Sequence, residues 1–241
     1  MKKSIYLLLL VVTAIFVSCK EEPSKFVEQL FTNKQISDAI EQCINVVVDS
    51  TANSLCMVDT IHRKYGYYYY ADSTYRLTLL PIAKTVVDTL TKYGYEAQIN
   101  MLFFYMNRAA EQCKNEVTQF WKEGIKEMVY LNPNQLLHGE NSAITDYVKA
   151  TKQSEFVSTL TSSILKKQFD ALNVVAKWNA LQEIYFEKTG NYSSIDVLAI
   201  SSQQMAIGFF KHMAIVEDAI REYPNLRGDK NGWLYKVFAT L

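Results

Sequence analysis

Apolar residues along most of this chain recur every three or four positions, which is the spacing of one face of an α-helix. The clearest stripe begins at Ile36 and contains Ile36, Ala39, Ile40, Cys43, Ile44, Val47 and Val48. The same spacing predicts helices over residues 79–93, 96–130, 142–152, 158–188, 197–223 and 233–238. Gly and Pro occur only 8 and 4 times in 241 residues, which favours helices over a turn-rich β protein. We therefore expect an all-α fold, a single-domain helical bundle of several long amphipathic helices.

Residues that commonly end helices separate these predicted elements. Gly94 follows the helix over 79–93, where glycine is a usual stop residue. Asn132-Pro133-Asn134 and Thr189-Gly190-Asn191 are predicted turns, and Pro224 is expected to end the helix over 197–223. Neither an internal repeat nor a low-complexity linker interrupts the series, so one domain is expected.

The segment from residue 65 to residue 75 is unusual because it contains Tyr65, Tyr67, Tyr68, Tyr69, Tyr70 and Tyr75. Tyrosine has a large flat ring with a polar tip, so it suits contact surfaces that are half exposed to water. One interpretation is a face that binds a sugar or a partner. We favour the other, a short connector, hairpin-like in form, whose rings pack over the bundle.

The first residues have the layout of a secretory signal peptide. Lys2 and Lys3 precede an apolar run over residues 5–17 that is shorter than the roughly 20 residues of a transmembrane helix. Phe16-Val17-Ser18-Cys19 resembles a lipobox, the site where signal peptidase II cleaves before an acylated cysteine. The alternative is an ordinary signal peptide with an incidental cysteine. We expect a signal peptide over 1–18, a lipidated Cys19 with its tether over 19–34, and a helical domain over 35–241.

The expected location is the cell envelope, with acyl chains such as palmitate on Cys19 holding the protein in a membrane, most readily the outer membrane. Several acyl chains anchor a protein stably, whereas one alone binds marginally. Lys20-Glu21-Glu22 resembles the acidic export signal of surface lipoproteins of the Bacteroidetes type. A solvated tether explains the same charges, so both a periplasmic and a surface-facing domain stay open.

Charge argues against nucleic acid as a partner. Removing the two lysines of the signal peptide from the 25 basic residues leaves 23, against 25 acidic ones. The remaining chain is therefore close to neutral, and no basic stripe stands out.

Three cysteines remain beyond the lipobox: Cys43, Cys56 and Cys113. If one helix runs from Cys43 to Cys56, their Cα atoms lie roughly 20 Å apart. A disulfide needs less than about 7 Å between these atoms. We therefore expect buried free thiols rather than a disulfide.

Five short elements, in order along the chain, resemble those of the bacterial family called domain of unknown function 4197. They are Met106-Asn107-Arg108-Ala109-Ala110-Glu111, Ala143-Ile144-Thr145-Asp146-Tyr147, Gly208-Phe209-Phe210-Lys211, Glu217-Asp218-Ala219-Ile220-Arg221-Glu222-Tyr223-Pro224 and Leu234-Tyr235-Lys236-Val237-Phe238. The resemblance covers roughly residues 36–238. It implies an exported helical protein and no known activity.

Signatures of catalysis, metal binding or cofactor binding are scarce. His62, His138 and His212 lie in separate segments without zinc-ligand spacing, and no glycine-rich phosphate loop or nucleophile elbow occurs. We expect no metal and no cofactor, and we assign no catalytic residue. His138 is expected in a solvated loop.

The best polar candidate is the set of side chains in the family-like elements, namely Asn107, Arg108, Glu111, Thr145, Tyr147, Glu217 and Arg221. Arg108 and Glu111 are three apart on one helix, so they share a face, and so do Glu217 and Arg221, four apart. If both pairs converge across the bundle, they could hold an anionic or zwitterionic ligand through forked arginine donors. The interpretation we favour is structural, with ion pairs and hydrogen bonds between helices.

Three functions follow from these features. The first is a non-catalytic envelope lipoprotein with a binding or scaffolding role toward a protein, glycan or lipid. The second is a carrier that holds a small apolar or amphipathic ligand in the bundle. The third is a hydrolase that uses carboxylates such as Glu111 and Glu217, which would have to lie within about 5–10 Å of each other. We favour them in that order.

Overall fold

The computed structural model describes residues 30–241, and no β-strand occurs among them. The all-α prediction is confirmed. The helices are α2 (Asn33–Leu55), α3 (Gly66–Tyr69), α4 (Lys84–Lys92), α5 (Glu96–Glu111), α6 (Lys114–Lys126), α7 (Pro133–Leu137), α8 (Ala143–Thr159), α9 (Leu165–Ala171), α10 (Val174–Thr189), α11 (Val197–Glu222) and α12 (Trp233–Phe238). Three short turns of helix accompany them: η1 (Ser73–Tyr75), η2 (Leu160–Ile164) and η3 (Pro224–Leu226). The signal peptide and Cys19 lie outside the described residues.

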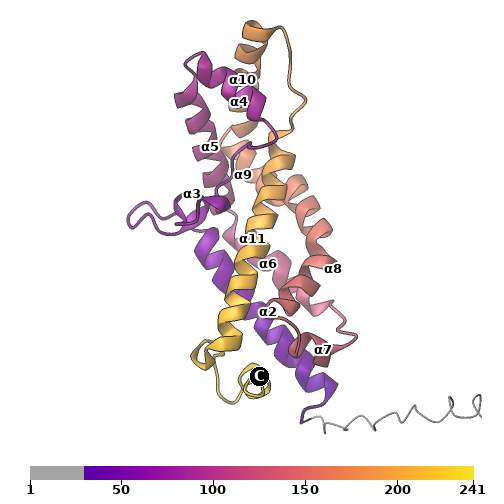
Figure 1. Cartoon of the computed structure of the whole chain (residues 1–241). Helices are drawn as coiled ribbons and strands as arrows, with labels where there is room; N and C mark the ends of the chain where they lie inside the picture. Colours follow the sequence, from indigo (N-terminus) through magenta and orange to yellow (C-terminus); the bar gives the residue numbers. More distant parts are fainter. Residues whose placement is uncertain (1–29) are drawn as a thin grey trace, which may run out of the picture. The chain divides into compact units, whose positions relative to one another are not determined.

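Helix α11 is the central element of the unit over residues 33–241, and Figure 1 shows it extending along most of the length of that unit. Its 26 residues correspond to about 39 Å of helix. Toward its C-terminal end, α2 and α8 pack against it, and α6 and α12 pack on α2. Toward its N-terminal end, α9 and α10 pack against it, and α5 packs on both.

Aromatic rings fill the middle of this arrangement. Trp121 of α6 stacks on Phe209 of α11 at 6.1 Å between ring centroids and lies 5.1 Å from Phe156 of α8. Phe210 meets Trp121 edge-on at 5.7 Å. All four side chains are buried, so the Phe209-Phe210 pair of the family-like element belongs to the core.

Two of the predicted long helices are interrupted. The helix predicted over 96–130 ends at Glu111, and α6 begins at Lys114. The buried Cys113 thiol donates there to the Ala109 carbonyl and contacts the Ile164 carbonyl of η2. An apolar residue at 113 keeps the three-and-four spacing in phase, so the sequence carries no sign of the break.

The helix predicted over 158–188 is divided in the same way. Asn173 has a φ of +51°, in the left-handed region that asparagine tolerates better than most residues, and it separates α9 from α10. The N-terminal part of this predicted helix is continuous with the one predicted over 142–152, because α8 extends to Thr159 and the π-helical turn η2 follows at once.

The remaining boundaries are close to the prediction. The helices predicted over 197–223 and 233–238 are confirmed as α11 and α12. Helix α4 ends just before Gly94 but begins only at Lys84, after a turn that contains Pro81. Pro133, predicted within a turn, is the first residue of α7, a position where a missing N–H is harmless.

The tyrosine-rich connector is not a hairpin, because it forms helix α3 and the 3₁₀ turn η1. Its rings do pack over the bundle. Tyr67 and Tyr75 are buried against Gly208 of α11, where an added Cβ would lie 3.3 Å from the first ring and 3.4 Å from the second. Glycine at 208 therefore lets both rings pack closely against the helix.

The three cysteines are buried and unpaired, as predicted. Burial disfavours the thiolate, and it raises the pKa of Cys113 to about 12. Among residues 30–241, no helix combines the length and the apolar character that crossing a bilayer requires.

His212 of α11 is a buried polar group that the sequence analysis did not single out. Its Nδ1 lies 3.2 Å from Thr51 Oγ1 of α2, and its Nε2 lies 3.0 Å from the Tyr70 hydroxyl. The imidazole is 4% exposed, and this burial lowers its pKa from 6.5 to about 4. The neutral ring therefore joins the tyrosine-rich connector to two long helices.

We expect this histidine to make folding sensitive to acid. Between pH 6.5 and about 4 the unfolded chain binds a proton that the folded chain does not, so the free energy of unfolding falls as pH falls. The loss reaches at most about 3 kcal/mol. His212→Gln should reduce this pH dependence in denaturant titrations, whereas His138→Gln, in an exposed loop, should leave it unchanged. Equal pH dependence in both variants would contradict the assignment.

Candidate functional site

Six of the seven polar residues singled out in the sequence lie in two separate clusters, and Tyr147 lies outside both. Cys43 of α2 lies within electrostatic range of Glu217 and Arg221, and Cys56, at the end of the same helix, lies near Glu111. The two cysteines are thirteen positions apart, which corresponds to roughly 20 Å of helix. The structure therefore does not bring the two charged pairs together. Each pair belongs to a cluster of its own.

The first cluster, on α5, holds the tyrosine-rich connector. Asn107 is buried, its Oδ1 accepts the Leu77 N–H at 2.8 Å, and its Nδ2 donates to the Leu77 carbonyl at 2.8 Å. This two-way bonding satisfies the backbone of Leu77 as a neighbouring strand would. The amide also donates to the Phe103 carbonyl one turn earlier. Asn107 therefore fixes the end of the connector to α5.

Glu111 fixes the beginning of the same connector. Its Oε1 accepts the Tyr68 N–H at 2.9 Å, in the first turn of α3, and its Oε2 accepts from Arg108 Nη1 at 2.5 Å. Burial raises the pKa of Glu111, while the Tyr68 N–H and Arg108 act in the opposite direction. The Arg108 guanidinium also lies over the Phe104 and Tyr69 rings, 5.1 and 5.5 Å from their centroids. The carboxylate thus caps α3, whose N-cap residue Tyr65 makes no side-chain cap of its own.

Gly66 allows this close approach. Its φ of +86° lies in the left-handed region that favours glycine, and an added Cβ would overlap the Glu111 carboxylate and the Met57 carbonyl. Close packing at Gly66 thus positions this part of the connector against Glu111, and hydrogen bonds position Leu77 against Asn107. None of these backbone partners was evident from the sequence.

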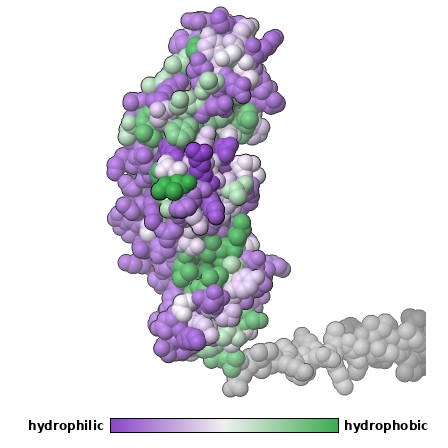
Figure 2. All heavy atoms as spheres, turned by 90° about the vertical axis from the view of Figure 1, so that its left-hand side faces the viewer, coloured by the Kyte–Doolittle hydropathy of each residue, from purple (hydrophilic) through white to green (hydrophobic). Residues whose placement is uncertain are grey.

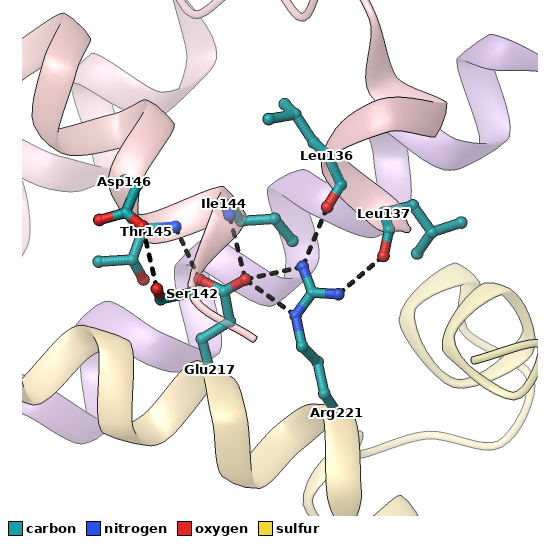
Figure 3. Close-up of polar contacts among 8 residues, drawn as sticks. All are labelled: Leu136, Leu137, Ser142, Ile144, Thr145, Asp146, Glu217 and Arg221. Atoms are coloured by element: carbon teal, nitrogen blue, oxygen red, sulfur yellow. Dashed lines mark hydrogen bonds and ion pairs between the residues drawn. The ribbon is translucent and has the colours of Figure 1, made fainter. Parts of the chain in front are cut away.

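The second cluster, on α11, holds two helix ends, as Figure 3 shows. Glu217 is fully buried and accepts the Ile144 N–H at 3.1 Å and the Thr145 N–H at 2.7 Å. These are amides of the first turn of α8, whose own N-cap residue Ser142 makes no side-chain cap. A negative charge at a helix N-terminus is favoured by the orphan amides and by the helix dipole.

Arg221, one turn further along α11, completes this cluster. Its Nε and Nη2 donate to Glu217 Oε1 at 3.0 and 2.8 Å. The same guanidinium donates to the Leu136 carbonyl at 3.0 Å and the Leu137 carbonyl at 2.7 Å, at the C-terminal end of α7 (Figure 3). The helix dipole favours a cation at the C-terminal end of α7, as it favours an anion at the N-terminal end of α8. One ion pair thus ends one helix and begins the next.

The other predicted residues contribute differently. Thr145 takes part through its backbone N–H, and its side chain is buried. Tyr147 lies outside the cluster, since its hydroxyl donates to the Val129 carbonyl. Arg227, which the sequence analysis missed, donates to the Ile220 and Arg221 carbonyls and so caps α11. Its only signal is a position shortly after Pro224.

The chemistry open to these carboxylates is limited by their partners. Both Glu111 and Glu217 are occupied by backbone amides and an arginine. The α2 residues near them, Cys56 and Cys43, are separated by roughly 20 Å of helix, so the two carboxylates do not share one cleft. A carboxylate pair for glycoside hydrolysis needs about 5–10 Å. Within residues 30–241, no three histidine, cysteine or acidic side chains are grouped as metal ligands. Both clusters are arranged to hold backbone in place.

An apolar groove lies elsewhere, between α5 and α10. Its volume is about 360 Å³, and it is lined by Ala97, Gln98, Met101, Leu102, Lys177, Ala180, Leu181 and Ile184. Figure 2 shows hydrophobic surface in this upper region. Lys177 is the one charged residue of the lining. Its Nζ lies 4.3 Å from the Tyr105 ring centroid and donates to the Leu172 carbonyl at 2.9 Å. A groove between two helices was not evident from the sequence, since each helix alone only shows an apolar face.

Comparison with known proteins gives one match. The model of a family described as a protein of unknown function (DUF4197) matches residues 31–239, nearly the whole of the described chain. The search of curated proteins and the search of solved structures each gave no match.

The contact between Gly66 and Glu111 predicts unequal effects at two glycines that share a backbone conformation. Gly66→Ala and Gly94→Ala both place a side chain at a φ near +87°, but the methyl group at 94 has no neighbour within 4 Å. We expect Gly94→Ala to lower the free energy of unfolding by about 1 kcal/mol, from backbone strain alone. Gly66→Ala should lower it by at least about 3 kcal/mol, because the Met57 carbonyl and the Glu111 carboxylate must also move. Equal losses in urea titrations would contradict the close contact of Gly66 with these two groups.

Proposed function

The chain belongs to the DUF4197 family, and from this premise and the site geometry we propose that it is a non-catalytic binding protein of the cell envelope, anchored by lipid at Cys19. The anchor follows from the lipobox-like Phe16-Val17-Ser18-Cys19 after a basic start and a short apolar run. We place it in the outer membrane, with the domain facing either the periplasm or, if Lys20-Glu21-Glu22 acts as an export signal, the cell surface.

The observation that supports a non-catalytic role is that the buried charged side chains are bound to backbone groups and to each other. Glu217 and Arg221 make six hydrogen bonds among α7, α8 and each other, and Glu111 is held by Tyr68 and Arg108. Side chains engaged in this way stabilise a rigid body rather than attack a substrate. A carboxylate-dependent hydrolase would need both glutamates in one cleft, so we give that alternative the lowest rank.

A second candidate role, as a carrier, is favoured by the groove between α5 and α10. The ligand that matches it is a small molecule with an apolar body for Met101, Leu181 and Ile184. The Lys177 ammonium is already held by the Leu172 carbonyl and the Tyr105 ring, so the groove offers mainly apolar contact. Such a ligand would be bound between helices, where pockets of bundle proteins commonly occur.

Intact mass of the protein extracted gently from its host tests both roles in one experiment. Under denaturing conditions we expect a chain beginning at Cys19 with acyl groups attached, and Cys19→Ala should remain unacylated. An unmodified mature chain would contradict the anchor.

Native mass spectra of the same samples address the groove. A carrier should retain an added mass that Ala180→Trp, which fills the groove from an exposed position, removes without loss of fold. Glu183→Gln, on the same helix but outside the groove lining, is the control and should keep the ligand. An added mass that survives Ala180→Trp would place the ligand elsewhere, and a bare chain would contradict the carrier role while leaving the anchored binding protein in place.

A further inference from the structure

The loop over residues 57–65, between α2 and α3, projects from the body of the domain (Figure 1). It is held in one shape by Asp59, which is buried and accepts the His62, Lys64 and Tyr65 N–H groups at 2.8, 3.0 and 3.4 Å. Bonding to these amides lowers the pKa of Asp59 to about 2, so its carboxylate stays charged near neutral pH. Gly66 and Glu111 fix the end of the loop, as described above. A loop ordered in this way presents its outward side chains in a fixed arrangement.

The outward side chains include unusually exposed apolar ones. Ile61 is 84% exposed, and Met57, Val58 and Tyr65 are 43–44% exposed. The exposed part of this apolar surface contributes nothing to folding, because it stays in contact with water. An isoleucine exposed to this extent, in a loop held by Asp59, is suited to enter an apolar environment outside the protein.

Basic side chains lie beside these exposed apolar residues. His62, Arg63 and Lys64 follow Ile61 directly, and all three are exposed. Arg63 lies over the Tyr69 ring at 5.6 Å, and the nearby Arg76 lies over the Tyr68 ring at 4.8 Å. The only acidic group within the loop, Asp59, is turned inward onto backbone amides. Figure 2, which faces the loop, shows at mid-height a strongly hydrophobic spot bordered by strongly hydrophilic residues.

We propose that the loop over residues 57–65 inserts Ile61 into the interface of an anionic lipid bilayer while Arg63 and Lys64 contact lipid phosphates. Apolar, cationic and tyrosine side chains side by side are the combination found at membrane interfaces, where the apolar groups enter the acyl boundary, the cations meet headgroups and the tyrosines lie at their level. A protein partner fits less well, because a stable protein interface needs about 800 Å² from each partner, more than a short loop supplies. The contact is separate from lipidation of Cys19 and does not require it.

Flotation with lipid vesicles tests this contact on the chain over residues 19–241 carrying Cys19→Ser, which cannot be acylated. We expect it to bind vesicles of equal parts phosphatidylcholine and phosphatidylglycerol at least about tenfold more strongly than phosphatidylcholine alone, and less so at high salt. Ile61→Asp should lower binding to the anionic vesicles about tenfold, and so should the double variant Arg63→Glu/Lys64→Glu.

Matched controls distinguish binding through the loop from nonspecific adsorption of the protein to vesicles. Leu131→Asp changes an apolar residue that is 83% exposed but lies outside the loop, and Lys149→Glu/Lys230→Glu reverses two exposed lysines that also lie outside it. Both variants should bind like the parent. As a gain of signal, Ile61→Trp should bind at least as well, with indole fluorescence that shifts to the blue on adding anionic vesicles. Failure of the parent to float, equal binding by all variants, or loss with the charge reversal alone would each overturn the proposal. The last result would mean electrostatic adsorption without insertion.

Discussion

The ion pair between Glu217 and Arg221 is the constraint on which the arrangement around the C-terminal half of α11 depends. A carboxylate buried as completely as Glu217 is tolerated only with a counter-charge and with donors for its remaining lone pairs. Arg221 supplies the charge and the first amides of α8 supply the donors. Because Arg221 is bound in turn to the last carbonyls of α7, the turn between α7 and α8 has one position on α11 in which all of these groups are satisfied. The packing of α8 on α11, and with it the aromatic core around Trp121, follows from that position.

Side chains of long helices also hold the ends of short helices elsewhere in the domain. Short helices that lack caps of their own are held by side chains from long ones: α3 by Glu111 of α5, α12 by Gln42 of α2, whose Oε1 accepts the Leu234 N–H at 2.9 Å. Helix α11 itself has a local cap at its start, where Asp196 accepts the Leu198 and Ala199 N–H groups. The elements that resemble the family, Met106–Glu111 and Glu217–Pro224, are therefore the segments that hold distant backbone. This accounts for polar residues in an otherwise apolar core as supports for distant backbone. The groove between α5 and α10 and the loop over residues 57–65 are the surface features on which our functional proposals rest.

The sequence predicted the helical class, the spans of α11 and α12 and the free cysteines. It also predicted that the two residues of each charged pair lie on the same face of one helix. Periodicity suffices for these, since spacing along one helix determines which residues share a face. It did not reveal the breaks at Cys113 and Asn173, because the apolar spacing continues in phase across both. Nor could it place the partners of Glu217, Arg221 and Asn107, because those partners are backbone groups of Ile144, Leu137 and Leu77, and a backbone amide or carbonyl leaves no mark on residue type. The separation of the two charged clusters depends on the direction of α2, which only the tertiary structure supplies.

A double-mutant cycle on Glu217 and Arg221, measured by urea unfolding, tests the central claim most directly. Glu217→Gln and Arg221→Met should each lower the free energy of unfolding by about 3–5 kcal/mol, because each leaves a buried charge or helix end unsatisfied. The double variant should lose clearly less than the sum, with a coupling of at least about 1.5 kcal/mol. The exposed pair Lys166 and Asp170 on α9, also four residues apart, is the reference and should show a coupling below about 0.5 kcal/mol. If Glu217 and Arg221 behave like that reference, with small and additive losses, the claim that they hold α7 and α8 in place is contradicted.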